Sequence, residues 1–145
     1  MEIIETRTSE ETFQLGKKLG ETAQRGDIYA LVGDLGVGKT VFSKGFAEGL
    51  AIDEVISSPT FTLINEYQGG RLPLYHFDIY RIEEAEELDA IGFQDYIYGN
   101  GVCLVEWANR IPEIFPEHTV WIKIEKDYMQ EDYRKVSVAR QPAEI

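Results

Sequence analysis

Cysteine, long apolar runs and a leader segment are scarce or missing in this sequence, and each gap excludes a class of protein. There is one cysteine, Cys103, so no internal disulfide framework is expected, which fits a reducing compartment. No window holds the roughly 20 apolar residues of a membrane span. Residues Met1 to Glu5 lack the basic flank and apolar stretch of a signal peptide. We therefore expect a cytoplasmic protein without a membrane segment.

Basic residues are also scarce. The chain has 14 Lys and Arg residues against 26 Asp and Glu residues, which gives a net charge of −12. Nucleic-acid binders usually carry a basic patch and gain much of their affinity from phosphate contacts. Because the basic residues here are scattered, we expect no autonomous nucleic-acid binding. An acidic surface that faces a basic protein partner stays open as an interpretation.

The length of 145 residues and a hydrophobic share of 43% predict a single globular domain, residues 1–145. Near its start, Thr8 to Glu11 forms a capping-box pattern, which predicts a helix from there to about Gln24. Small residues recur on one face of this helix at Thr12, Gly16 and Gly20. They predict that the helix packs closely on a neighbouring element.

The rest of the chain alternates between predicted strands and helices. Two runs, Ile28 to Val32 and Val102 to Glu106, are apolar without alternation, as strands buried in a parallel sheet are. Helices are predicted at Gly38 to Leu50 and at Glu83 to Ala90. The other predicted strands are Phe61 to Tyr67, Leu72 to Ile79, Thr119 to Glu125 and Lys135 to Ala139, the last two near an edge. This order predicts an α/β fold with a largely parallel core and some antiparallel pairs.

The segment from Gly33 to Thr40, GDLGVGKT, matches the phosphate-loop pattern G-x-x-x-x-G-K-[ST] in full. Glycines in such a loop allow backbone N–H groups to approach a phosphate. The glycines here are Gly33, Gly36 and Gly38, and the variable positions hold Asp34, Leu35 and Val37. This segment predicts a site for the phosphates of a nucleotide.

The last two residues of the motif carry its chemistry. Lys39 would lie between the β- and γ-phosphates, and the Thr40 hydroxyl would ligate magnesium. The next residue is Val41, so no second threonine follows Thr40 and the candidate binding residues of the loop end there. Since the motif follows a predicted strand and opens a predicted helix, we predict a nucleotide site on a P-loop NTPase-like three-layer sandwich.

Two acidic residues close predicted strands, Glu106 after Val102 to Val105, and Asp78 near the end of Leu72 to Ile79. Ligands of open α/β sheets lie beyond the carboxyl ends of the parallel strands. A P-loop also needs a further acidic group for its metal ion. A metal-binding or water-positioning role and a solvated strand end are therefore both open for each residue.

Thr60 lies in the segment from Ser58 to Thr62, between the phosphate-loop helix and the next strand. In nucleotide switches a threonine at this place reaches the magnesium ion while the γ-phosphate is present. The alternative is a rigid turn, because Pro59 restricts Ser58 to extended conformations.

Three residues beside the acidic positions also have two interpretations. His76 shares a strand face with Asp78, and is either a site residue or a satisfied core histidine. Trp107 and Asn109 follow Glu106 and would flank a nucleotide, although Trp107 would fit the core equally well.

Four segments, in this order and spacing, resemble the bacterial TsaE (YjeE) family: Gly33 to Thr40, Ser58 to Thr62, His76 to Arg81 and Val105 to Trp107. The resemblance runs from the first predicted helix to about Pro116. It implies a P-loop α/β ATPase of the pathway that forms threonylcarbamoyladenosine on the tRNA adenosine beside the anticodon. The resemblance also implies docking on a complex of TsaB and TsaD, which ATP hydrolysis resets between turnovers.

The resemblance assigns roles to individual residues. Thr40 and Glu106 match the magnesium positions, Asp78 matches the water-positioning or base residue, and Thr60 matches a switch-like threonine. With Lys39, Asp78 and Thr60 are thus the expected catalytic residues, and ATP and Mg²⁺ the expected ligands. The N-terminal segment contributes to the adenine pocket of the family, for which Ser9 and Thr12 are the candidates here.

Three other function classes fit the motifs less well or stay open. A small-molecule kinase needs an arginine-rich lid, whereas only Arg81 and Arg110 lie near the motifs. A GTPase switch is disfavoured, because the D-x-x-G match at Asp89 to Gly92 follows an acidic helix and no N-K-x-D pattern occurs. A nucleotide-gated adaptor stays open, since P-loop proteins often hydrolyse slowly without a partner.

Overall fold

The computed structural model describes residues 1–34, 36–57, 59 and 63–145. Within them a 7-stranded sheet has the strand order β1-β7-β6-β2-β5-β4-β3. The strands are β1 (Glu2–Thr6), β2 (Ile28–Val32), β3 (Ile64–Tyr67), β4 (Leu74–Asp78), β5 (Val102–Glu106), β6 (Val120–Asp127) and β7 (Gln130–Ala139).

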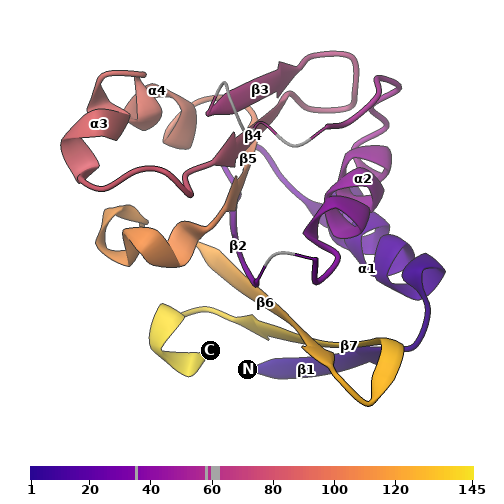
Figure 1. Cartoon of the computed structure of the whole chain (residues 1–145). Coiled ribbons are helices and arrows are strands. Elements are labelled where there is room, and N and C mark those ends of the chain that lie inside the picture. Colours follow the sequence, from indigo (N-terminus) through magenta and orange to yellow (C-terminus); the bar gives the residue numbers. More distant parts are fainter. Residues whose placement is uncertain (35, 58, 60–62) are drawn as a thin grey trace.

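Helices cover both faces of this sheet (Figure 1). On one side lie α1 (Ser9–Thr22) and α2 (Lys39–Gly49), and on the other α3 (Ala85–Asp89) and α4 (Phe93–Ile97). Three short 3₁₀ helices complete the described structure: η1 (Ala108–Arg110), η2 (Pro112–Ile114) and η3 (Pro142–Glu144). The predicted three-layer α/β sandwich is therefore confirmed.

The centre of the sheet is parallel and its flanks are antiparallel. Strand β2 pairs in parallel with β5 and β6, and β5 pairs in parallel with β4. Strands β3, β7 and β1 each run antiparallel to their neighbours. Side chains alternate between two hydrophobic clusters, one on each face of the sheet. Burial on both faces explains why β2 and the first four residues of β5 are apolar without alternation, as predicted.

Several predicted boundaries were wrong. Strand β1 was not predicted, and it forms the edge of the sheet next to β7, pairing Ile4 with Val136. Helix α4 was also missed, and β7 begins at Gln130 instead of Lys135. These short or polar segments take their form from pairing and packing with distant parts of the chain, which overrides local propensity.

The predicted close packing of the first helix is confirmed. Thr8 caps α1, with its Oγ1 accepting the Glu11 N–H at 3.1 Å. A Cβ atom added to Gly16 or Gly20 would overlap backbone of α2, and one added to Gly45 or Gly49 would overlap backbone of α1. The two backbones therefore touch directly. This contact fixes α2, whose first two residues, Lys39 and Thr40, are the last two of the phosphate-loop motif.

Candidate functional site

The loop between β2 and α2 has the backbone form that its glycines predict. Gly36 and Gly38 adopt φ values of 78° and 102°, a region that residues with side chains rarely enter. A Cβ atom on Gly33 would lie 2.8 Å from the Ile124 carbonyl oxygen, so this position is also restricted to glycine. Because α2 begins at Lys39, its first free N–H groups lie at the end of the loop, where an anion would be stabilised. Leu35 lies outside the described residues.

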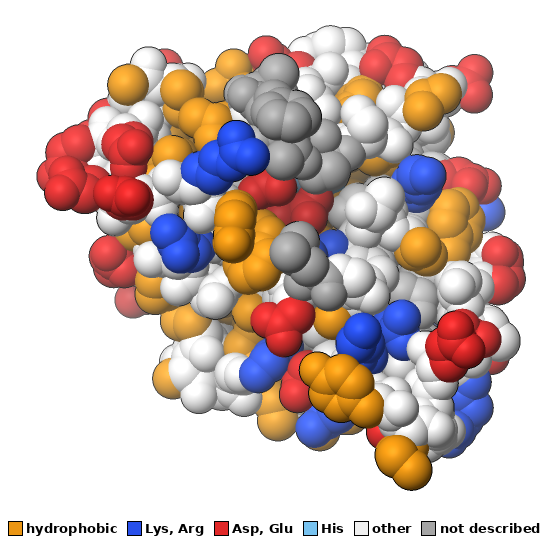
Figure 2. Space-filling model, in the orientation of Figure 1, with side chains coloured by type: hydrophobic (Ala, Val, Ile, Leu, Met, Phe, Trp, Pro, Cys, Tyr) orange, Lys and Arg blue, Asp and Glu red, His pale blue; other side chains and the backbone are white. Residues whose placement is uncertain are grey.

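A cavity of about 450 Å³ lies beside this loop and the carboxyl ends of β4 and β5. Seven predicted site residues line it: Gly36, Gly38, Lys39, Thr40, Asp78, Glu106 and Trp107. Val41, which follows Thr40 on α2, is half-buried and lines it too, so an apolar side chain stands at this place on the wall. Figure 2 shows acidic side chains recessed near the centre of this face, next to hydrophobic ones. Residues from separate parts of the sequence thus meet at the predicted sheet edge, as the rule for open α/β sheets requires.

Lys39 is held inside the site, with 6% of its surface exposed. Its Nζ donates a hydrogen bond to the Gly33 carbonyl oxygen at 2.6 Å and lies 3.7 Å from the centroid of the Trp107 ring. Burial lowers the pKa of Lys39 below its ordinary value. Three carboxylates oppose that shift by attraction to the ammonium: those of Glu106, Asp78 and Asp34.

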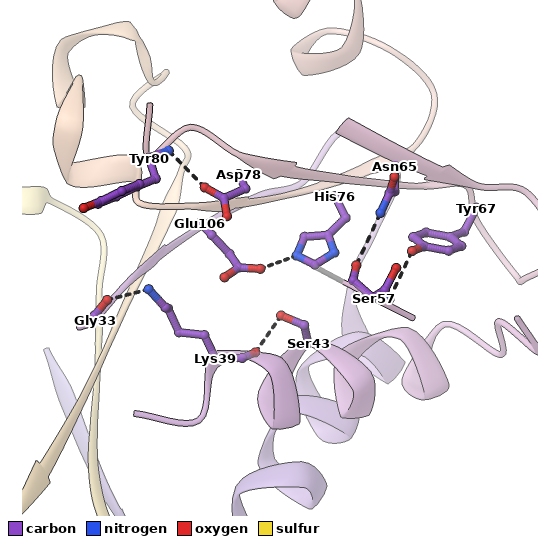
Figure 3. Close-up of polar contacts among 10 residues, drawn as sticks. All are labelled: Gly33, Lys39, Ser43, Ser57, Asn65, Tyr67, His76, Asp78, Tyr80 and Glu106. Carbon is purple, nitrogen blue, oxygen red and sulfur yellow. Dashed lines mark hydrogen bonds and ion pairs between the residues drawn. The ribbon is translucent and has the colours of Figure 1, made fainter. Parts of the chain in front are cut away.

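Glu106 and His76 form a buried pair on the same face of the sheet (Figure 3). Their Nε2 and Oε2 atoms are 2.6 Å apart, and His76 and Glu106 are 1% and 4% exposed. The Nδ1 atom of His76 is buried and finds no hydrogen-bond partner among the described residues. His76 therefore contacts the site through Glu106, and among the described residues only its Nε2 atom has a hydrogen-bond partner.

Asp78 lies directly opposite Glu106 in the parallel pairing of β4 and β5. Its Oδ1 accepts the Tyr80 N–H at 2.9 Å. Burial raises the pKa of the Asp78 carboxyl, and the Glu106 charge adds to this effect, while the Tyr80 hydrogen bond and the Lys39 ammonium oppose it. A buried carboxylate with a raised pKa at the wall of a cavity is a candidate proton acceptor.

Trp107 turns the chain at the end of β5 with a φ of 62°, an uncommon value for a bulky residue. Its ring lies against Lys39 on one side and packs on Tyr80 with ring centroids 4.7 Å apart. Trp107 therefore forms part of the cavity wall. Asn109 does not reach the main cavity, and lines instead a neighbouring one of about 510 Å³ with Asp34.

The two candidates for an adenine pocket, Ser9 and Thr12, line a third cavity of about 190 Å³ that borders Gly36 and Gly38. The Thr12 hydroxyl is committed to Thr6, with 2.7 Å between their Oγ1 atoms. This hydrogen bond joins the start of α1 to the end of β1. Thr12 thus shapes the wall of the cavity, whereas Ser9 is exposed.

Sequence reasoning missed three residues around the loop. Tyr80 and Arg81 line the main cavity two and three positions after Asp78, so the position of that acid was a signal for them. Arg134, on β7, donates from Nε to the Val37 carbonyl oxygen at 2.7 Å, across 97 positions of sequence. No local sequence pattern predicts that contact. Thr60 and the rest of its segment, apart from Pro59, lie outside the described residues, so its predicted role stays a prediction.

Two kinds of feature are missing from the described residues. In those ranges, no group of three or more His, Cys, Asp or Glu side chains is placed to hold a metal ion. The part of the chain with described placement also contains no helix long and apolar enough to cross a bilayer.

A glycine loop between a parallel strand and a helix, with acidic residues ending two adjacent strands, defines the class of P-loop α/β proteins. The comparison with protein families then identifies the particular group. The chain belongs to the TsaE family, whose model, described as "Threonylcarbamoyl adenosine biosynthesis protein TsaE", matches residues 6–136.

Individual relatives agree with this assignment. A tRNA threonylcarbamoyladenosine biosynthesis protein TsaE from Bacillus subtilis is 50% identical over 121 residues, which cover 83% of this chain and 75% of the relative. The protein of the same name from Treponema pallidum is 42% identical over 134 residues, covering 92% and 97%. The crystal structure of Bacillus subtilis YdiB matches 94% of this chain and 83% of its own, with a TM-score of 0.79 and 42% identity.

Proposed function

We propose that this protein binds ATP with Mg²⁺ in the cavity beside the phosphate loop and hydrolyses it. One observation carries the proposal: Lys39, Asp78 and Glu106, from three elements, converge on one cavity of about 450 Å³ at the loop. The volume lies within the range of about 300–1,000 Å³ that is common for small-molecule sites. A cation for phosphates, a proton acceptor and a second acid are the parts that phosphoryl transfer to water needs.

The donor set fits magnesium. Mg²⁺ prefers oxygen ligands and is usually held by one or two carboxylates together with substrate phosphates, rather than by an all-protein cage. Thr40 and Glu106 offer a hydroxyl and a carboxylate on the cavity wall. The lack of a cluster of three metal-binding side chains among the described residues agrees with a site that phosphates complete. The ion would neutralise charge that develops on the phosphates.

The chain's own residues have distinct tasks in this proposal. The loop N–H groups and Lys39 hold the phosphates, with Lys39 exchanging the Gly33 carbonyl oxygen for a phosphate oxygen. Asp78 orients the attacking water and accepts its proton, a role that its raised pKa supports. The Trp107 ring shields Lys39 from solvent, which strengthens the attraction between the ammonium and the phosphates.

Within the pathway, we infer that the chain supports threonylcarbamoyladenosine formation on the tRNA adenosine beside the anticodon by acting on a TsaB–TsaD complex. The family membership supports the pathway. The charge of −12 supports a protein partner over direct contact with tRNA. We expect slow hydrolysis by the isolated chain and stimulation by the partner complex.

Calorimetry and phosphate release test the proposal. We expect a non-hydrolysable ATP analogue to bind with 1:1 stoichiometry and more tightly with Mg²⁺ than with a chelator. We expect phosphate release from ATP to rise when purified TsaB and TsaD are added. Absence of analogue binding would refute the nucleotide site. Binding without any turnover, alone or with the partners, would leave a nucleotide-gated adaptor. A phosphorylated metabolite in place of free phosphate would indicate a kinase.

A further inference from the structure

His76 and Glu106 form a short hydrogen bond in a buried place, which is a more specific contact than side-chain packing on a strand requires. The 2.6 Å distance between Nε2 and Oε2 is shorter than that of an ordinary N–H···O hydrogen bond, and charge on the acceptor shortens such bonds. A carboxylate only accepts hydrogen bonds, so the Nε2 atom of His76 carries the proton. Removing a carboxylate from water costs free energy unless a donor replaces the water. His76 is that donor for one oxygen of Glu106.

The sheet register creates this contact. His76 lies opposite Leu104, and Asp78 lies opposite Glu106 in the parallel pairing of β4 and β5. Alternation along both strands then places His76, Asp78 and Glu106 on the face that α2 covers. The side chain of His76 on β4 thus contacts Glu106 diagonally, because Glu106 lies two residues beyond the direct partner of His76 on β5.

The second oxygen of Glu106 has a different environment. In Figure 3 the carboxylate lies between the imidazole ring and the side chain of Lys39, with Oε2 bound to His76 and the other oxygen on the Lys39 side. Glu106 also lines the cavity, whereas His76 is not among the residues that line it. One oxygen of the Glu106 carboxylate is therefore hydrogen-bonded to His76, and the other is available to the cavity.

We infer that His76 is a positioning residue for Glu106: its Nε2–H holds one carboxylate oxygen so that the other points into the cavity at a fixed place. This inference rests on the proposed binding of ATP with Mg²⁺, in which Glu106 contributes to holding the ion. Hydrogen-bond partners behind a metal ligand typically change metal affinity by about 10- to 100-fold when removed. A purely structural histidine would affect stability without changing the metal dependence.

The test is calorimetric titration of a non-hydrolysable ATP analogue over a series of Mg²⁺ concentrations, a binding measurement that needs no turnover. His76→Gln places an amide N–H near the position of Nε2. Its matched control, His76→Asn, places the same group near Nδ1, too far from Glu106. His76→Leu keeps an apolar volume and removes every donor. Thermal melting reports the stability of each variant.

Mg²⁺ should increase the affinity for the analogue, and we measure the Mg²⁺ concentration that gives half of this increase. We expect that concentration to rise about 10- to 100-fold in the Asn and Leu variants. The Gln variant should recover most of the wild-type dependence. Analogue affinity in a chelator should be the same in all variants. In a Glu106→Gln background, His76→Leu should cause no further shift, because the two residues act as one unit. If the Leu variant does not fold, the comparison of Gln with Asn decides.

Two results separate failure of this inference from failure of the proposed function. A wild-type chain whose analogue binding is absent or independent of Mg²⁺ overturns the proposed function, and the positioning role with it. If analogue binding by the wild-type chain depends on Mg²⁺ and the Asn variant needs the same Mg²⁺ concentration for half of the affinity gain, only the positioning role is overturned. An equal shift in the Gln and Asn variants also overturns it, since the donor position would then not matter.

Discussion

Lys39 links the phosphate loop to the walls of the cavity through one buried ammonium group. Water has been replaced around it by a carbonyl oxygen at 2.6 Å and an indole ring at 3.7 Å. This burial disfavours the cation, which is why the pKa of Lys39 is lowered. The same low dielectric strengthens its attraction to an anion, because Coulomb energy grows as the surroundings become less polarisable. A phosphate oxygen that replaces the Gly33 carbonyl oxygen as acceptor would thus be attracted strongly to this ammonium.

Substituting Lys39 by Ala should therefore weaken ATP binding without unfolding the chain. Loss of a charge-assisted contact typically costs about 1.5–3 kcal/mol, roughly a 10- to 150-fold loss of affinity. Calorimetry with an ATP analogue measures it, and thermal melting checks the fold. Lys44→Ala, at an exposed position of the same helix, is the matched control and should bind normally. Unchanged affinity in the Lys39 variant would remove the basis for a nucleotide site.

Asp78 predicts a pH dependence of stability in the chain without nucleotide or metal. Burial raises its pKa above the ordinary value of 3.8, so the folded chain binds this proton more tightly than the unfolded chain does. The resulting stabilisation is fully present below the unfolded-state pKa and is lost as the pH rises through the folded-state pKa. At pH 7 the ionised group therefore destabilises the fold. Asp78→Asn should raise the free energy of unfolding at pH 7, and this gain should disappear below the unfolded-state pKa.

Urea denaturation at a series of pH values measures this gain. Because neutralising any acid relieves repulsion in a chain of charge −12, the control is Asp53→Asn at an exposed position. The gain should be larger for Asp78 than for Asp53. An Asp78→Asn variant that is less stable than wild type at pH 7 would contradict the assignment of burial as the dominant cause.

At the scale of elements, the close contact of α1 with α2 decides how firmly the phosphate loop is held. Gly16 and Gly20 on α1 face backbone of α2, and Gly45 and Gly49 on α2 face backbone of α1. The packing is reciprocal, with each pair four residues apart and therefore on one face of its helix. Since α2 begins where the loop ends, a displaced α2 would move the N–H groups that the loop offers to a phosphate.

The substitution Gly45→Ala should therefore destabilise the fold. In an unobstructed helix this change stabilises by up to about 1 kcal/mol, because alanine restricts the unfolded chain more than glycine does. Here the new Cβ atom would overlap the Phe13 carbonyl oxygen, and overpacking of this kind costs about 1–3 kcal/mol. The sign of the change is thus the test, measured by urea denaturation.

Gly69→Ala is the control for that prediction. Gly69 lies in the turn after β3, where the nearest atom to an added Cβ is a Glu54 side-chain oxygen at 3.9 Å. We expect its stability to stay close to that of wild type. A stabilised Gly45→Ala chain would mean that the two helices separate at low cost.

For the whole molecule, the charge of −12 sets which partners are compatible. A polyanion such as tRNA is repelled, and the counterion release that drives most protein–nucleic acid binding is not available. A protein partner avoids this cost. The proposed nucleotide site would then matter to the partner only if its ATP and ADP states bind it with different affinities.

The chain should therefore fail to bind free tRNA at physiological salt, yet join a TsaB–TsaD complex in an ATP-dependent way. Size-exclusion chromatography with purified partners and tRNA, in ATP analogue, ADP and no nucleotide, measures both. Lys39→Ala is the control and should bind the partners as the nucleotide-free chain does. Tight binding to free tRNA would contradict the first half. Equal partner binding in all nucleotide conditions would contradict the second.

Features that lie within short stretches of chain could be predicted from the sequence. The phosphate loop is readable because its three glycines, lysine and threonine all lie within eight consecutive positions, and each has a local backbone or chemical reason. The apolar runs of β2 and β5 identify the buried centre of the sheet. Glu106 and Asp78 were placed by one further rule, that parallel strands end at the same edge.

Features that depend on contacts between distant segments could be seen only in the folded chain. Glu2 to Thr6 is a strand because it pairs with β7 from the other end of the chain. The hydrogen bond from Arg134 to Val37 spans 97 positions, and the pair of His76 and Glu106 spans 30. Such contacts require the strand order and the register, and a shift of register by one residue would turn the side chains of a strand to the opposite face. Local sequence carries the chemistry of each residue, but only the assembled sheet determines which residues meet.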